Sequence, residues 1–180
     1  DLCKREGHRD RAIIETLFSC GLRVSELTHL KLSNLYREEQ FVRVMGKGSK
    51  ERLVPISPRA LQELDFWFAD RNAMKIKEGE EDYIFLNRRG AHLTRTMILI
   101  MIKNYAKDAG IKKNISPHTL RHSFATALLD GGANLRAIQT MLGHENISTT
   151  EIYTHIDTTT LRKEILEHHP RNIAYKQQHQ

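Results

Sequence analysis

The sequence predicts an α+β fold that is mostly helical and carries one small antiparallel β-sheet. Apolar residues recur at the three-to-four-residue spacing of amphipathic helices in several segments, beginning with residues 10–20. Two short β-prone runs, 41–45 and 52–56, flank a glycine-containing turn at 46–50, which is typical of a hairpin. With 180 residues and no internal repeat, the chain is expected to form one domain with its own core.

The first predicted elements are a core helix, a short second helix and the hairpin. Residues 10–20 end at Gly21, a common stop signal, and place these apolar residues on one helical stripe: Ile13, Ile14, Leu17 and Phe18. Residues 25–30 are expected to form the second helix. The hairpin that follows carries a basic tip at 46–50.

Two longer helices are predicted next. Pro58 stands at a favourable first helical position, and the stripe behind it consists of Leu61, Leu64, Trp67 and Phe68. The charged stretch 75–82 is predicted to be a surface loop. Thr94 can cap a helix that runs to about residue 109, with Gly110 behind it.

The last part of the chain is also predicted to be helical. The expected helices are one from Ser116 and Pro117 to Gly131, one between Asn134 and Gly143, and an amphipathic one at 158–168. Ser148 opens the segment that holds Tyr153, and a polar tail follows the final helix.

Charge and cysteine content indicate a polyanion-binding protein of a reducing compartment. Lys and Arg number 28 against 22 Asp and Glu, a formal charge of +6. Cys3 and Cys20 are too few for a disulfide framework, which favours the cytoplasm. The longest apolar run, 97–102, is far too short for a membrane span, so we expect no membrane partner.

Two arginine-containing segments suit phosphate recognition. His118, Arg121 and His122 share a region of one predicted helix, where a bidentate guanidinium and imidazole groups can hold a phosphodiester. Arg23 follows a helix stop, and Glu26 lies one turn further on, where it can orient that arginine. The alternatives are a solvated helix face and a surface salt bridge.

The hairpin carries four basic residues against a single acid. These are Arg43, Lys47, Lys50 and Arg52, and the acid is Glu51. A lysine on such a tip can enter a DNA groove, although a solvated turn fits the same residues. A phosphate-binding loop is excluded because Gly48 stands where that motif needs Ser or Thr.

No metal site is expected. His118 and His122 have the helical spacing of zinc ligands, and His144 is a conceivable third ligand. However, Thr119 replaces the glutamate of the zinc-protease motif, and Arg121 would set a fixed cation beside the metal. A serine hydrolase is equally unsupported, because no Gly-x-Ser-x-Gly elbow is present.

Tyr153 is the candidate nucleophile. A phenol with a pKa of about 10 attacks poorly at neutral pH. A phosphate clamped by two arginines would stabilise the phenolate and the charge of the transition state. Tyr153 therefore becomes reactive only together with such a clamp.

Five motifs in order resemble the tyrosine recombinase (phage integrase) family, and Xer-type recombinases within it. They are residues 21–27 (GLRVSEL), 46–52 (GKGSKER), 117–126 (PHTLRHSFAT), 142–144 (LGH) and 153–155 (YTH), and the resemblance runs from about residue 8 to about 167. Phage and transposon integrases share these motifs.

The resemblance implies a role for each matching residue. Arg23 and Arg121 would clamp the phosphate, with His118 and His144 as supporting donors. Lys47 would act as general acid, and Tyr153 would attack to give a 3′-phosphotyrosyl DNA. Glu26 would support the arginine, and no cofactor is implied. The expected DNA-contacting residues are Arg43, Lys50, Arg52 and His122.

The resemblance also implies an assembly. Residues 1–180 would form the catalytic domain of a longer protein whose amino-terminal core-binding domain is absent here, and 158–180 would dock on a neighbouring protomer. A monomer without DNA would form a tetramer on a double-stranded core site, with itself or a paired recombinase. Two alternatives are a DNA-binding module with a vestigial site and a type IB topoisomerase.

Overall fold

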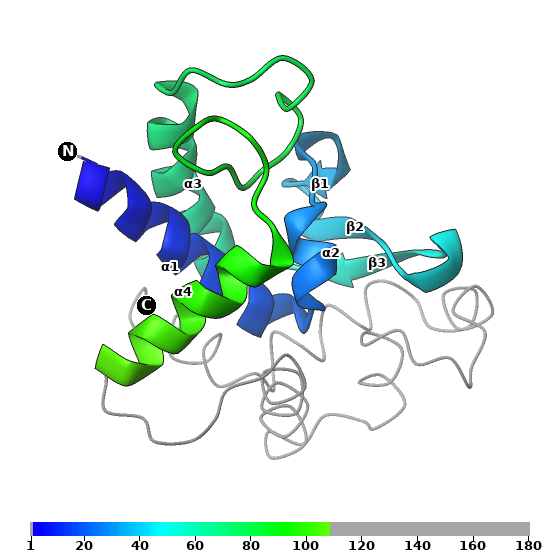
Figure 1. Ribbon diagram of the computed structural model, residues 1–180. Coiled ribbons are helices and arrows are strands. Elements are labelled where there is room, and N and C mark those ends of the chain that lie inside the picture. Colours follow the sequence, from blue (N-terminus) through cyan, green and yellow to red (C-terminus); the bar gives the residue numbers. More distant parts are fainter. Residues whose placement is uncertain (1, 109–180) are drawn as a thin grey trace, which may run out of the picture.

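The computed structural model describes residues 2–108, which form an α+β arrangement (Figure 1). The elements in chain order are α1 (Leu2–Cys20), α2 (Val24–Thr28), η1 (Leu32–Asn34), β1 (Leu35–Tyr36), β2 (Phe41–Met45), η2 (Lys47–Ser49), β3 (Glu51–Pro55), α3 (Pro58–Asn72) and α4 (Arg95–Asp108). Helix α1 packs along α3, while the sheet extends from the other side of α2 (Figure 1). The predicted fold class is confirmed.

The three-stranded sheet is antiparallel in the order β1-β2-β3. In β2, Val42 and Val44 are buried and Arg43 and Met45 are exposed, as the two-residue period of a strand requires. Val42 lies opposite Val54 of β3, so one face of the hairpin joins the core.

The core lies where α1, α2, α3 and the 84–93 segment meet. Its largest side chain is Trp67 of α3, which is 1% exposed and donates its indole N–H to the carbonyl of Ile84 at 2.8 Å. Ile13 of α1 and Leu27 of α2 are fully buried in the same cluster. Burial of each such side chain stabilises the fold by about 1.5–3 kcal/mol.

The helix boundaries follow from local chemistry. Gly21 takes a φ of 63° behind α1 and donates its N–H to the carbonyl of Leu17 at 2.9 Å. Ser57 caps α3 by accepting from the N–H of Ala60 at 3.1 Å, with Pro58 at the first position. Thr94 caps α4 through the N–H of Met97 at 3.2 Å, as predicted.

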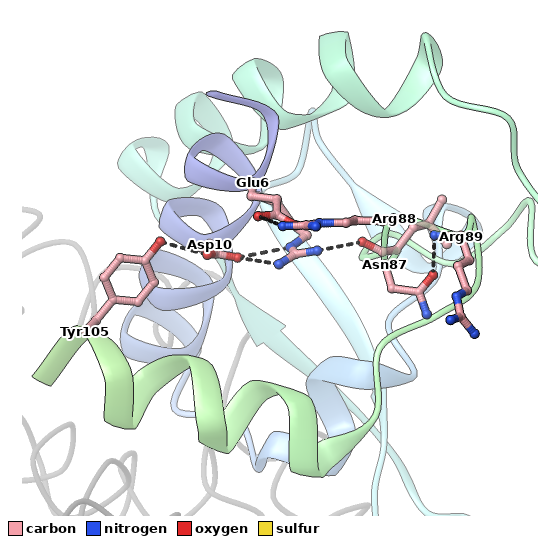
Figure 2. Close-up of polar contacts among 8 residues, drawn as sticks. Glu6, Asp10, Asn87, Arg88, Arg89 and Tyr105 are labelled. Carbon is pink, nitrogen blue, oxygen red and sulfur yellow. Dashed lines mark hydrogen bonds and ion pairs between the residues drawn. The ribbon is translucent and has the colours of Figure 1, made fainter. Parts of the chain in front are cut away.

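A polar network fastens α4 to α1 and to the 86–91 turn (Figure 2). The hydroxyl of Tyr105 donates to Asp10 at 2.7 Å, and Arg9 donates to the other carboxylate oxygen of Asp10 at 2.9 and 3.0 Å. Arg9 also reaches the carbonyl of Leu86 at 3.3 Å. The network therefore ties the C-terminal half of α4 to α1.

The structure extends the predictions in three places. Helix α1 begins at Leu2 rather than near residue 10, β3 begins at Glu51, and the two-residue strand β1 was not predicted. The loop predicted at 75–82 is confirmed. The helices predicted from Ser116 onward and at 158–168 lie outside the described residues. Across residues 2–108, no helix combines the length and apolarity needed to span a bilayer.

Candidate functional site

Arg23 is the N-cap residue of helix α2, and its backbone N–H is bound by the side chain of Glu26. The residue is extended, with φ −67° and ψ 148°, so it stands just outside the helix. Its N–H donates to Oε1 of Glu26 at 2.8 Å, and its Nη1 lies 4.0 Å from Oε2 of the same carboxylate. With 33% of the side chain exposed, the guanidinium is available to solvent and to a ligand.

Glu26 is buried, and its carboxylate serves two arginines. Arg52 donates Nη2 to Oε1 at 2.9 Å and forms a second, shorter bond through Nη1 to Oε2. Burial by itself raises the pKa of Glu26. The hydrogen bonds and charge of Arg52, together with the N–H and charge of Arg23, outweigh burial and leave the pKa below its ordinary value. Glu26 is therefore a permanent anion at neutral pH.

Arg52 is buried, whereas the sequence predicted an exposed residue that contacts DNA. Its side chain is only 3% exposed and lies against Glu26 in the interior. Arg52 shares the inward face of β3 with Val54, while Glu51 points outward. The burial of this guanidinium against Glu26 argues against the expected contact with DNA. The alternation of the strand was the signal that sequence reasoning missed.

The hairpin tip presents two lysines to solvent. Lys47 and Lys50 are both exposed, on either side of a turn closed by the N–H of Gly46 and the carbonyl of Lys50 at 2.7 Å. Gly48 and Ser49 take positive φ values of 71° and 59°. Figure 1 shows this tip projecting beyond the helices at the end of β2 and β3. A lysine in this position can approach a large ligand such as a nucleic acid.

Arg43 occupies the outer face of the sheet. Its guanidinium lies 5.5 Å from the ring centroid of Tyr36, and its Nε lies 3.9 Å from Oε2 of Glu51. The arginine is 43% exposed. Arg43 is thus a surface cation beside the tip.

Arg23 and Gly46, the residue just before Lys47 in the hairpin turn, both lie close to the buried pair of Glu26 and Arg52. Gly46 lies so close that a Cβ there would be 3.3 Å from Nη1 of Arg52 and 3.7 Å from Oε2 of Glu26. The remaining candidate residues fall outside the described part of the chain, and they are His118, Arg121, His122, His144 and Tyr153. Within residues 2–108, no three His, Cys, Asp or Glu side chains gather as metal ligands would.

Comparison with known proteins gives a consistent result. A family model described as the phage integrase family matches residues 1–160. Tyrosine recombinase XerD of Staphylococcus aureus is 47% identical over 171 residues, which cover 95% of this chain and 58% of that protein. The chain thus spans less than two thirds of the length of this relative.

Solved structures show the same likeness. The crystal structure of XerA recombinase is 34% identical and superimposes with a TM-score of 0.70, covering 92% of this chain and 58% of that one. XerH site-specific recombinase, bound to its difH substrate in a pre-cleavage complex, is 29% identical with a TM-score of 0.69, covering 84% of this chain and 44% of that one.

Proposed function

The chain belongs to the phage integrase family, and from this premise we propose that it cuts and rejoins DNA strands at a specific site through a covalent bond to Tyr153. The observation that carries the proposal is the family match over residues 1–160. The five motifs that the sequence carries in order all lie within that range. The reaction is a transesterification.

The proposed roles follow from charge and geometry. Arg23 and Arg121 hold the non-bridging oxygens of the scissile phosphate, and His118 and His144 donate to the same group. The phenol oxygen of Tyr153 forms the new bond to phosphorus while the bond to the 5′ oxygen breaks.

Lys47 supplies the proton that completes the 5′-hydroxyl, and Glu26 keeps Arg23 oriented. The exposed position of Lys47 at the hairpin tip supports the first role. The second is supported by the hydrogen bond from the backbone N–H of Arg23 to Glu26 and by the 4.0 Å approach of Nη1 to Oε2. The phosphotyrosine keeps the energy of the broken bond for rejoining, so the reaction needs no metal or nucleotide. Arg43, Lys50 and His122 contact the DNA beside the cleavage point.

The proposed setting is site-specific recombination of the Xer type in the cytoplasm. The three relatives reported above, XerD, XerA and XerH, are all Xer recombinases, and the XerH structure contains its difH substrate. A tetramer on a paired double-stranded core site, with residues 158–180 docking on a neighbouring protomer, would couple the cleavages of its subunits. A type IB topoisomerase would instead relax supercoils as a monomer.

The decisive experiment traps the covalent intermediate. The protein is incubated with a pool of nicked genomic duplexes, whose nick lets the cleaved strand diffuse away, and adducts are resolved on denaturing gels. We expect an adduct with the unmodified chain in EDTA, none with Tyr153→Phe, and an undiminished adduct with the control Tyr36→Phe.

Absence of the adduct, even after fusion to an amino-terminal core-binding domain of the family, would contradict the enzyme proposal. That result would favour a DNA-binding module whose site is vestigial. Relaxation of supercoiled plasmid without strand exchange would instead favour the topoisomerase.

A further inference from the structure

The buried pair between Arg52 and Glu26 is not explained by stability. Both side chains are 3% exposed, and taking two charges out of water offsets much of their attraction. Apolar residues of similar volume often fill such a place as well or better. A buried ion pair is more readily explained when it holds particular groups in particular positions.

On one side, the pair holds the start of α2. Oε1 of Glu26 accepts from the backbone N–H of Arg23 at 2.8 Å and from Nη2 of Arg52 at 2.9 Å. The two-pronged contact with Arg52 stops the carboxylate from rotating. The position of the Arg23 backbone at the start of α2 therefore depends on a guanidinium that comes from a different element.

On the other side, the pair lies against Gly46, where β2 enters the hairpin turn. Gly46 immediately precedes Lys47, and a Cβ at Gly46 would lie 3.3 Å from Nη1 of Arg52 and also 3.3 Å from the carbonyl oxygen of Lys50. Gly46 has a φ of −91°, which any residue can adopt, so the close approach is the reason that glycine suits this position. Arg52 itself sits in β3, opposite Val44 of β2.

We propose that Arg52 is a positioning residue that sets Arg23 and Lys47 relative to each other by binding Glu26 on one side and packing closely against Gly46 on the other. The inference rests on the proposed strand-cleavage reaction and deepens it. Arg52 touches no DNA. It acts by fixing the distance between the cation that binds the phosphate and the lysine that protonates the leaving group.

The test compares three variants in single-turnover cleavage, with rates expressed per folded molecule. Arg52→Lys keeps the charge but loses the two-pronged contact with Glu26. Gly46→Ala leaves both partners of the pair in place but crowds Nη1 of Arg52 and the Lys50 carbonyl, so the start of the turn must shift slightly. Arg71→Lys is the matched control, because Arg71 is also 3% exposed but donates to the carbonyl of Tyr83, in the 73–94 loop. We expect a loss of roughly 10²-fold for Arg52→Lys, a smaller loss for Gly46→Ala, and little change for Arg71→Lys.

A second substrate separates positioning from folding. In a duplex with a 5′-bridging sulfur, the leaving group is a thiolate, which departs without a proton because thiols have a pKa of about 8.5. We expect this substrate to relieve most of the loss in Gly46→Ala and part of the loss in Arg52→Lys, which also disturbs Arg23.

Two results would overturn the inference. One is an Arg52→Lys variant that cleaves as fast as Arg71→Lys, which would make Arg52 merely structural. The other is equal losses on both substrates, which would mean that Lys47 is not displaced. Failure of the unmodified chain to form any adduct would instead contradict the proposed function itself.

Discussion

At the scale of single residues, the charge on Glu26 is the feature on which the described half of the site depends. Burial works against this charge, and the two arginines around it more than compensate. Because the folded pKa lies below the unfolded value, the carboxylate stabilises the fold above the unfolded pKa. The contribution is lost as the pH falls through the folded pKa.

Glu26→Gln should therefore destabilise the protein in a pH-dependent way. At pH 7 we expect a loss of about 3 kcal/mol in the free energy of unfolding, because the variant removes the buried anion that accepts two hydrogen bonds from Arg52. The difference from the unmodified protein should shrink as the pH falls below about 4.3, the ordinary value for glutamate. Urea unfolding monitored by Trp67 fluorescence between pH 7 and pH 3 measures this, and a constant difference over that range would contradict the assignment.

At the scale of elements, α4 packs against α2 and the core through apolar side chains and is joined to α1 by a hydrogen bond. Ile98 and Ile102 of α4 are buried in the core. Tyr105 donates this hydrogen bond to Asp10, which is only 6% exposed (Figure 2). Burial and the hydrogen bond to the Asp10 carboxylate raise the pKa of Tyr105 to about 12, so the phenol stays protonated and continues to donate.

Tyr105→Phe should loosen the attachment of α4 to α1 without disturbing the rest of the core. We expect a loss of about 1 kcal/mol, because a bond to a charged acceptor is removed from a residue that is partly open to water. Tyr36→Phe is the control, since it keeps the ring that lies beneath Arg43. Equal unfolding midpoints in urea for the two variants would show that the hydroxyl of Tyr105 contributes nothing.

At the scale of the whole molecule, the positive charge of +6 is partly gathered beside the candidate site. Arg23, Lys47 and Lys50 reach solvent around the start of α2 and the hairpin tip, with Arg43 on the outer face of the sheet. A protein that neutralises phosphates releases counterions, so its affinity for DNA falls with salt.

Replacing one tip lysine should remove one phosphate contact. For Lys50→Gln, the slope of log affinity against log salt should decrease in magnitude by about 0.9. Arg37→Gln is the control, because Arg37 is paired with Asp65 at 2.8 Å and lies beyond the far end of β2 from the tip. Fluorescence anisotropy between 50 and 200 mM salt, roughly the range over which such contacts weaken, reports the slope. An unchanged slope would place Lys50 away from DNA.

Elements whose signals are local were predicted correctly. The stripe ending at Gly21, the helix start at Pro58, the cap at Thr94 and the turn between β2 and β3 each depend on residues within a few positions of one another. Strand β1 was missed because two residues form a strand only by pairing with Phe41 and Val42. The start of α1 was missed because this end of the helix is stabilised by a long-range contact, between His8 and Asp70 of α3.

The sequence by itself determined the family and the identity of the candidate chemical groups, because ordered motifs are a property of the chain and need no coordinates. Only the tertiary structure decided what Arg52 does. Its partner Glu26 lies 26 positions away, and the burial of both depends on how β3 packs against α2. From the neighbouring residues in sequence, a charged residue on a hairpin is expected to be exposed to solvent. Whether it faces water or a buried carboxylate depends on long-range packing, which the local pattern alone does not specify.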